Sequence, residues 1–150
     1  MIRNTLGCAS AKEIAEHLLI CDNAFVPRLS SRTDIARYAH KVFSNAQCFE
    51  AWAEDILVGL VAAYCDNHET NTAFITNVSV LPNWQGLGVA TQLMSRCCQQ
   101  VFEAGFKKIE LQVSQGNKIA ISFYEKHGFA AVKEENGTLN MILDFERNGR

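Results

Sequence analysis

One stretch of the chain changes its hydrophobic period twice, and this limits the folds that it can form. Residues 73–80 (AFITNVSV) are rich in β-branched side chains and predict a strand. Between Gly88 and Ala104 the apolar residues recur at helical spacing, and residues 109–113 (IELQV) alternate as a strand does. A strand, a helix and a strand in this order form a crossover connection, which makes the two strands parallel. The sequence therefore predicts one parallel pair within residues 73–113.

The remaining strands read as an antiparallel meander. The run from Ile56 to Tyr64 is apolar throughout, which is typical of a strand covered on both faces. Asn136-Gly137 favours a type I′ turn between two neighbouring strands. The strands expected in the meander cover residues 2–7, 48–54, 56–64, 130–135 and 138–145.

Three helices are expected besides the crossover helix. Ser10 and Glu13 form a capping box at the start of the first, which ends near Asn23. Ser30 or Ser31 is expected to cap the second, and the third covers residues 118–126. The prediction is therefore a single α+β domain over residues 1–150, layered α/β/α, with a mixed, mostly antiparallel sheet and about four helices.

Charge and hydropathy exclude several classes of partner. The net charge of −2 offers no basic surface for nucleic acid and no polybasic membrane anchor. The longest apolar run, residues 56–65, is far shorter than the ~20 residues of a membrane span, and residues 1–10 lack the apolar core of a signal peptide. A cytoplasmic protein is expected. Its six cysteines show no zinc spacing, so they are interpreted as small apolar residues and no metal is expected.

The turn between the strand at 73–80 and the helix from Gly88 is the strongest candidate for a binding site. Gly86 and Gly88 allow close approach to a backbone whose N–H groups point out of a helix start, which suits an anion. No Asp or Glu occurs from Thr70 to Phe102, so no carboxylate there repels a phosphate. The turn lacks the P-loop lysine, and Thr91 stands where the dinucleotide fingerprint needs a third glycine or alanine.

Two motifs together resemble the GNAT superfamily of N-acetyltransferases. Gln85-x-x-Gly88-x-Ala90, preceded by Val78-Ser79-Val80-Leu81-Pro82, is similar to its acetyl-CoA motif Q/R-x-x-G-x-G/A. Residues 117–129, with Asn117, Ala120, Tyr124 and Gly128-Phe129, are similar to a second motif of the family. The resemblance covers about residues 48–145 and implies a sheet whose two parallel strands splay apart.

The resemblance implies acetyl-CoA as cosubstrate and assigns residues to it. The strand that contains Val78, Ser79 and Val80 would pair with the pantetheine arm, and the Val78 N–H would polarise the thioester carbonyl. The amine would then attack directly, without an acyl-enzyme. The backbone N–H groups that would hold the pyrophosphate belong to Gln85, Gly86, Leu87, Gly88, Val89 and Ala90.

Tyr124 resembles the general acid of the family, which protonates the departing CoA thiolate. A phenol is protonated at neutral pH and can donate a proton to a thiolate. Asn117 lies seven residues earlier and therefore on the same helical face. It is interpreted both as a helix cap and as a contact to the cofactor.

The general base and the acceptor are less constrained by the sequence. The strand at 73–80 has no carboxylate, so the candidates for the base are Glu54, Asp66, His68 and Glu110. In the family, the loop between the two N-terminal helices helps to form the acceptor pocket. Here it carries Arg28 and Arg32, which suit a carboxylate or a phosphate.

These observations favour an enzyme that acetylates a primary amine of a small molecule, such as a nucleotide-linked amino sugar or another anionic amine. One alternative is acetylation of a protein N-terminus or lysine. The other is a non-catalytic domain that binds CoA as a sensor. The sequence does not fix the oligomeric state, and a homodimer is compatible with it.

Overall fold

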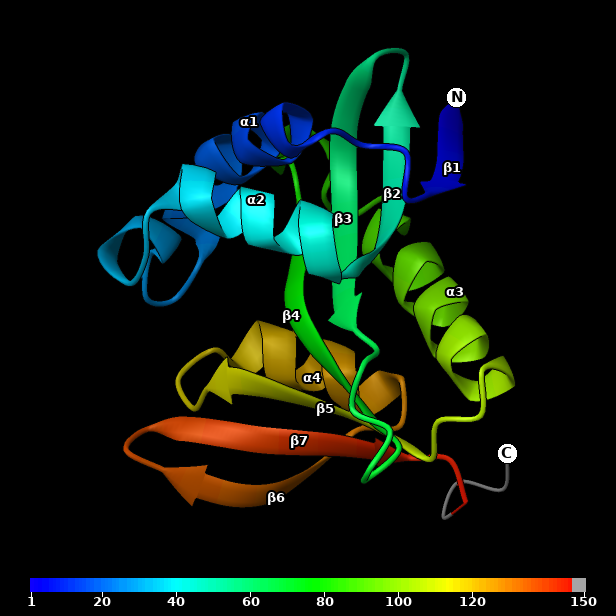
Figure 1. The fold of residues 1–150 in the computed structure, drawn as a ribbon. Helices are drawn as coiled ribbons and strands as arrows, with labels where there is room; N and C mark the ends of the chain where they lie inside the picture. Colours follow the sequence, from blue (N-terminus) through cyan, green and yellow to red (C-terminus); the bar gives the residue numbers. More distant parts are fainter. Residues whose placement is uncertain (147–150) are drawn as a thin grey trace.

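The computed structural model describes residues 1–146 and contains one seven-stranded sheet in the order β1-β2-β3-β4-β5-β7-β6 (Figure 1). Three short 3₁₀ turns lie at Asp22–Ala24, Leu29–Ser31 and Pro82–Trp84. The strands and helices in chain order are β1 (Ile2–Leu6), α1 (Ala11–Cys21), α2 (Ile35–Asn45), β2 (Gln47–Ala53), β3 (Ile56–Tyr64), β4 (Thr72–Val80), α3 (Val89–Glu103), β5 (Lys108–Ser114), α4 (Lys118–Lys126), β6 (Ala130–Glu135) and β7 (Thr138–Asp144).

The arrangement is α+β with helices on both faces of the sheet, as predicted. All neighbouring strands are antiparallel except β4 and β5, which are parallel. Helices α1 and α2 cover one face of the β1–β4 half, and α3 covers the other (Figure 1). Helix α4 packs on the α3 face, and its residues Ala120 and Ile121 lie against the larger core. The strand β3 is buried on both faces, which confirms the interpretation of its apolar run.

The parallel pair is short, and this opens the centre of the sheet. Strand β4 is nine residues long, but its ladder with β5 covers only Thr72–Phe74, opposite Lys108–Glu110. Beyond Phe74 the two strands separate, and Figure 1 shows β4 and β5 diverging with α4 behind the gap. The backbone of the second half of β4 is therefore left without a neighbouring strand on the β5 side.

A bulge in β4 determines which of its side chains face each helix layer. The register with β3 skips a residue at Thr76, since Ala62 lies opposite Asn77 and Ala63 lies opposite Ile75. Before the skip Ile75 packs into the core beneath α3, and after it Val78 does. Asn77 is thereby turned to the α1 face, where it is buried.

One predicted helix start is wrong. Helix α2 is capped by Asp34, whose side chain accepts a hydrogen bond from the Arg37 N–H, and not by Ser30 or Ser31. Both serines belong to a 3₁₀ turn, and the Ser30 hydroxyl donates to Asp22 at 2.7 Å, so it is already engaged. The capping box at Ser10 and Glu13 is confirmed.

The C-terminal hairpin is also confirmed. Both turn residues have positive φ, 54° at Asn136 and 83° at Gly137, as a type I′ turn requires. Within residues 1–146, no helix is both long enough and apolar enough to traverse a bilayer.

Candidate active site

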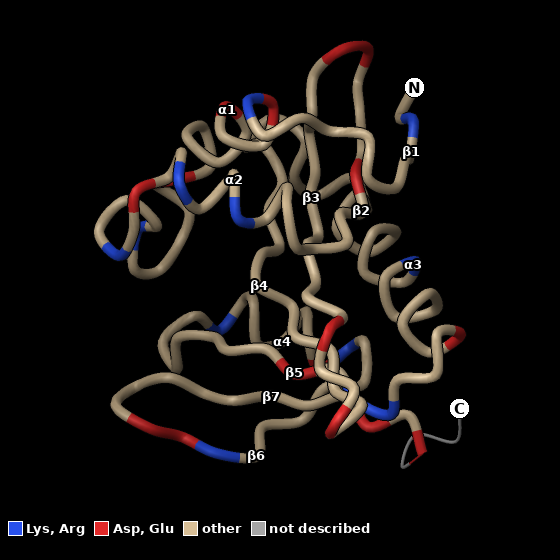
Figure 2. The backbone as a smooth tube through the Cα atoms, in the orientation of Figure 1, with Lys and Arg blue, Asp and Glu red and all other residues tan. Residues whose placement is uncertain are grey.

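The turn that precedes α3 has the conformation that an anion site needs. Gly86 and Gly88 both adopt the left-handed conformation, with φ of 78° and 81°, which favours glycine. Gly88 is the N-cap residue of α3, and no side chain caps the helix, so its first N–H groups are not engaged by a capping group. A Cβ at Gly88 would meet no atom within 4 Å, so the space above the turn is open. Figure 2 shows no charged residue along β4 or at the start of α3.

The second half of β4 presents backbone groups to the gap. The Leu81 N–H donates to the Val58 carbonyl at 2.9 Å, so Leu81 faces β3. Backbone direction alternates along a strand, and Val78 and Val80 therefore direct their N–H and carbonyl groups away from β3. Gln85 approaches from that side, and its Nε2 donates to the Val80 carbonyl at 3.1 Å. The Val78 N–H and carbonyl and the Val80 N–H are placed to pair with an extended ligand, whereas Gln85 engages the Val80 carbonyl.

Helix α4 carries the two residues of the second motif. The Asn117 side chain accepts a hydrogen bond of 3.2 Å from the Ala120 N–H, so it caps the helix. Tyr124 is half-buried, and its ring contacts Phe129 edge-on with the centroids 6.0 Å apart. Burial raises the pKa of the Tyr124 phenol to about 12, so the hydroxyl keeps its proton at neutral pH.

The structure brings these predicted residues to one side of the molecule. Val78, Val80 and Tyr124 lie at the edge of the same core, beneath α3 and α4. The glycine turn follows directly after β4. Ser79 differs from its neighbours, because its side chain is buried on the opposite face of the sheet. Its role as a cofactor contact stays a prediction.

A buried polar row on the α1 side of β4 was missed by the sequence analysis. His17 is 2% exposed; its Nδ1 lies 2.8 Å from the Leu57 carbonyl and its Nε2 lies 2.8 Å from Ser79 Oγ. The Ser79 hydroxyl donates to Asn77 Oδ1 at 2.7 Å. Burial lowers the pKa of His17 to about 4, so the ring is neutral at physiological pH. The row ties α1 to β4 at the bulge.

Helix α2 is tied to the same bulge. The Tyr38 hydroxyl donates to the Thr76 carbonyl at 2.9 Å and also contacts Thr76 Oγ1 at 2.7 Å. Burial raises the pKa of Tyr38 to about 12, and the charge of Arg32 opposes this rise. Hydrogen bonds from Ser30 lower the pKa of Asp22, and the charge of Arg28 adds to this effect.

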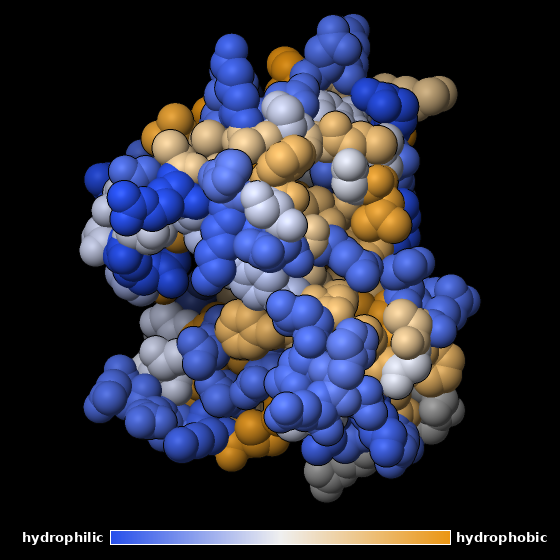
Figure 3. All heavy atoms as spheres, in the orientation of Figure 1, coloured by the Kyte–Doolittle hydropathy of each residue, from blue (hydrophilic) through white to orange (hydrophobic). Residues whose placement is uncertain are grey.

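A cleft of about 880 Å³ opens at the base of the gap, on the face that carries α2. Its lining includes Phe74 and Glu110, the last rung of the parallel pair, and it carries charges of both signs. Figure 3 shows this face as mostly polar, with apolar atoms exposed between its upper and lower parts. The charged and aromatic residues of its lining are Lys41, Tyr64, Asp66, Phe74, Lys108 and Glu110.

Of the four candidates for the general base, two line the cleft and two do not. Asp66 and Glu110 line it. Glu54 lies in the turn between β2 and β3, and the His68 ring packs on Phe106 with the centroids 5.4 Å apart; neither belongs to the cleft lining.

All six cysteines lie among the described residues and are free thiols. In residues 1–146, no three or more His, Cys, Asp or Glu side chains are grouped so as to hold a metal ion.

Comparison with known proteins links this geometry to one family. Residues 11–129 match the model described as "Acetyltransferase (GNAT) family". The chain is 28% identical over 119 residues to the N-alpha-acetyltransferase MAK3 of Arabidopsis thaliana, covering 78% of this chain and 63% of that relative. It thus spans a little under two thirds of the plant protein. It is 25% identical over 128 residues to the L-2,4-diaminobutyric acid acetyltransferase of Vibrio cholerae, and the match covers 85% of this chain and 71% of that relative.

The fold is also similar to a solved structure that contains the cofactor. The crystal structure of the PaiA N-acetyltransferase from Thermoplasma acidophilum in complex with coenzyme A has a TM-score of 0.74 to this chain. The two chains are 14% identical, and the match covers 96% of this chain and 99% of the other.

Proposed function

The chain belongs to the GNAT family of acetyl-CoA-dependent N-acetyltransferases, and we propose that it acetylates the primary amine of a small molecule that also carries a carboxylate. The observation that supports this acceptor is the charge of the cleft at the base of the β4–β5 gap. Lys41 and Lys108 suit a carboxylate, and Asp66 and Glu110 suit an ammonium group. The name of the Vibrio cholerae relative, a diaminobutyric acid acetyltransferase, is consistent with such a zwitterionic acceptor.

Acetyl-CoA would bind along β4 and the glycine turn. The pyrophosphate would accept hydrogen bonds from the backbone N–H groups of residues 86–90, where the dipole of α3 favours negative charge. The predicted Gln85 N–H already donates to the Pro82 carbonyl at 3.4 Å. The pantetheine arm would pair with the free edge of β4 at Val78 and Val80, and Asn117 would contact the cofactor from the start of α4. Ser79 and Leu87 complete the proposed contacts.

Transfer would then take place at the middle of β4. The amine nitrogen attacks the thioester carbonyl carbon, and the Val78 N–H stabilises the negative charge that develops on the carbonyl oxygen. The carbon–sulfur bond breaks, and the Tyr124 hydroxyl donates its proton to the departing thiolate. The amine has to lose a proton as well, and we assign this step to Asp66, a carboxylate that lines the acceptor cleft. We assign all of these steps to one domain formed by residues 1–150.

A panel of acceptors tests the proposal. CoA release and product mass would be measured for diamino acids, ω-amino acids, a nucleotide-linked amino sugar and peptides with a free N-terminus. The highest kcat/KM is expected with an amine that bears a carboxylate. Turnover restricted to peptides would contradict this, and tight acetyl-CoA binding with no acceptor at all would favour a CoA sensor.

Acetylation of a protein N-terminus is the second candidate. The plant relative is an N-alpha-acetyltransferase by name, and the β6 strand is exposed along its length. A hollow of about 290 Å³ next to β6, lined in part by Lys133, Glu135 and Asn140, extends the polar face that a peptide could follow. The peptides in the panel decide between the two candidates.

A further inference from the structure

Glu110 has an unusual position for a carboxylate. It lies on the last rung of the parallel pair, opposite Phe74, where the sheet begins to open. Its side chain is half-buried and lines the cleft. A carboxylate removed from water is costly unless hydrogen bonds or a cation compensate for the lost solvation.

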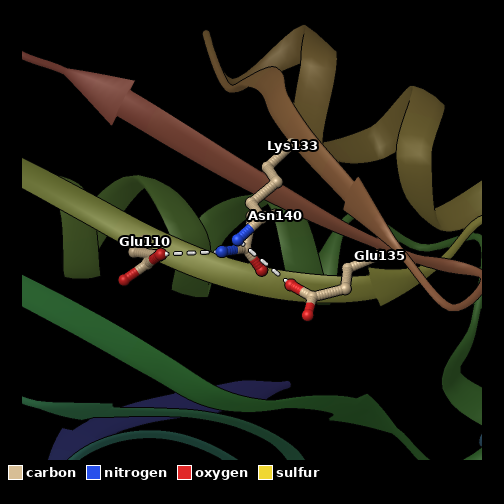
Figure 4. Close-up of polar contacts among 4 residues, drawn as sticks. All are labelled: Glu110, Lys133, Glu135 and Asn140. Atoms are coloured by element: carbon tan, nitrogen blue, oxygen red, sulfur yellow. Dashed lines mark hydrogen bonds and ion pairs between the residues drawn. The ribbon is translucent and has the colours of Figure 1, made fainter.

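The protein supplies only part of that compensation. Asn140 Nδ2 of β7 donates a hydrogen bond of 3.1 Å to Glu110 Oε2 (Figure 4). No cation pairs with Glu110 among the described residues, although Lys41 and Lys108 line the same cleft. Lys133, a cation next to Asn140, is held by Glu135 at 3.1 Å. Glu110 therefore keeps one oxygen free and an unpaired negative charge.

The spacing along β4 shows what such a charge could bind. Val78 lies four residues beyond Phe74, which at about 3.3 Å per residue is about 13 Å along the strand. An amine that reacts near the Val78 N–H is therefore well separated from the rung that holds Glu110. A ligand that reaches both places has to be extended and positively charged at its far end.

We propose that Glu110, oriented by Asn140, binds a second ammonium group of the acceptor, so that the enzyme selects acceptors with two amino groups. Glu110 is then a specificity residue and Asn140 a positioning residue. The inference rests on the proposed function, because it concerns the acceptor of the same acetyl transfer.

Matched pairs of amino acids isolate the effect of the second amine. Each diamino acid is compared with the ω-amino acid of equal length that lacks only the α-amine, as in 2,4-diaminobutyrate with 4-aminobutyrate and lysine with 6-aminohexanoate. The wild type is expected to prefer the diamino acid by about tenfold or more in kcat/KM at one chain length in the series. In Glu110→Gln the ratio should fall to near one through a higher KM for the diamino acid, while kcat/KM for the ω-amino acid changes little.

Two further variants separate selection from other roles. Asn140→Leu keeps the Glu110 charge but removes its donor, so the preference should fall only in part. Glu16→Gln removes one negative charge from the exposed surface of α1 and should leave the ratio unchanged. A general base at Glu110 would instead lower kcat for both members of a pair equally and alter the pH profile, and that result would overturn the proposal.

A binding measurement tests this inference separately from the proposed function, because it does not require acetyl transfer. Calorimetric titration of the same pairs into CoA-saturated protein measures the preference without any turnover. If the diamino acids bind more tightly and Glu110→Gln removes the difference, the inference holds even if acetyl transfer is not observed. Equal binding of both members in the wild type at every chain length, or a preference that persists in Glu110→Gln, would overturn it.

Discussion

Gly59 of β3 and Val89 of α3 approach so closely that a Cβ on Gly59 would come within 2.6 Å of Val89 Cγ1. The same Cβ would lie 3.1 Å from Leu93 Cδ1, one helical turn further along. Val89 is the first residue of α3 and directly follows the glycine turn. The absence of a side chain at Gly59 thus determines how near the sheet the helix start can lie.

Gly59→Ala should therefore disturb both the core and the turn. Overpacking of this kind usually costs about 1–3 kcal/mol, so the free energy of unfolding should fall by that amount. The Kd for acetyl-CoA should rise as well, because the displaced residue adjoins the proposed pyrophosphate site. Denaturant unfolding and calorimetry measure the two effects. An unchanged Kd in a clearly destabilised variant would show that the turn does not depend on this contact.

Because His17 is buried, we expect the free energy of unfolding to fall in mild acid. Its pKa is about 4 in the folded protein and 6.5 in the unfolded chain, so between these values the unfolded chain binds more protons. The stabilisation is complete above pH 6.5 and is lost as the pH falls towards 4, by about 3 kcal/mol in total.

His17→Gln is the matched variant for this titration. Its free energy of unfolding should vary less than that of the wild type between pH 6.5 and 4, as measured by urea denaturation. The lowered pKa of Asp22 acts below this window, since the ordinary value of that carboxyl is 3.8. Parallel pH dependence in both proteins would mean that His17 does not carry the effect.

Tyr124→Phe should slow the chemical step without altering the fold. The ring and its contact with Phe129 are kept, and only the proposed proton donor is removed. Because general acid catalysis contributes 10²–10⁴-fold, a loss of at least ~30-fold in the single-turnover rate is expected. The loss should shrink with a thioester whose thiol is more acidic, and a rate within about threefold of the wild type would remove Tyr124 from the mechanism.

Cys8 should be the first cysteine to react with an alkylating reagent. It is exposed, whereas burial raises the pKa of Cys21 to about 11 and that of Cys48 to about 12. The thiolate is the reactive form, so these buried groups should react only on unfolding. Mass spectrometry after a brief treatment with iodoacetamide at neutral pH gives the order of modification, and early labelling of Cys21 or Cys48 would contradict it.

Much of the fold follows from local signals in the sequence. The hydrophobic period defines the crossover unit, and Asn136-Gly137 defines the hairpin turn. The cap of α2 could not be chosen in this way, because four side chains able to cap lie within five residues, Ser30, Ser31, Thr33 and Asp34. The choice depends on Asp22, a residue far enough away that only the folded loop brings it to Ser30.

Two features of the site, the bulge in β4 and the burial of His17, are indicated by the sequence, although neither was predicted. Along β4 the apolar residues lie at 73, 74 and 75 and then at 78 and 80, so apart from Phe74 they change from odd to even positions, as a one-residue bulge requires. His17 shares a helical face with the apolar Ile14 and Cys21, which indicates burial. The cleft at Glu110 had no local signal, because it depends on how the β5–β7–β6 half lies beside β4.

The affinity of Gly88→Asp for acetyl-CoA tests the binding site most directly. Aspartate tolerates the left-handed conformation better than most residues, and its Cβ would meet no atom within 4 Å, so the fold should survive. Its charge would lie where the pyrophosphate is proposed to bind. Gly88→Asn supplies the same shape without the charge and serves as the control. Calorimetry should give a Kd that rises by far more than tenfold for Gly88→Asp and by much less for Gly88→Asn, whereas wild-type affinity in a folded Gly88→Asp would contradict the account.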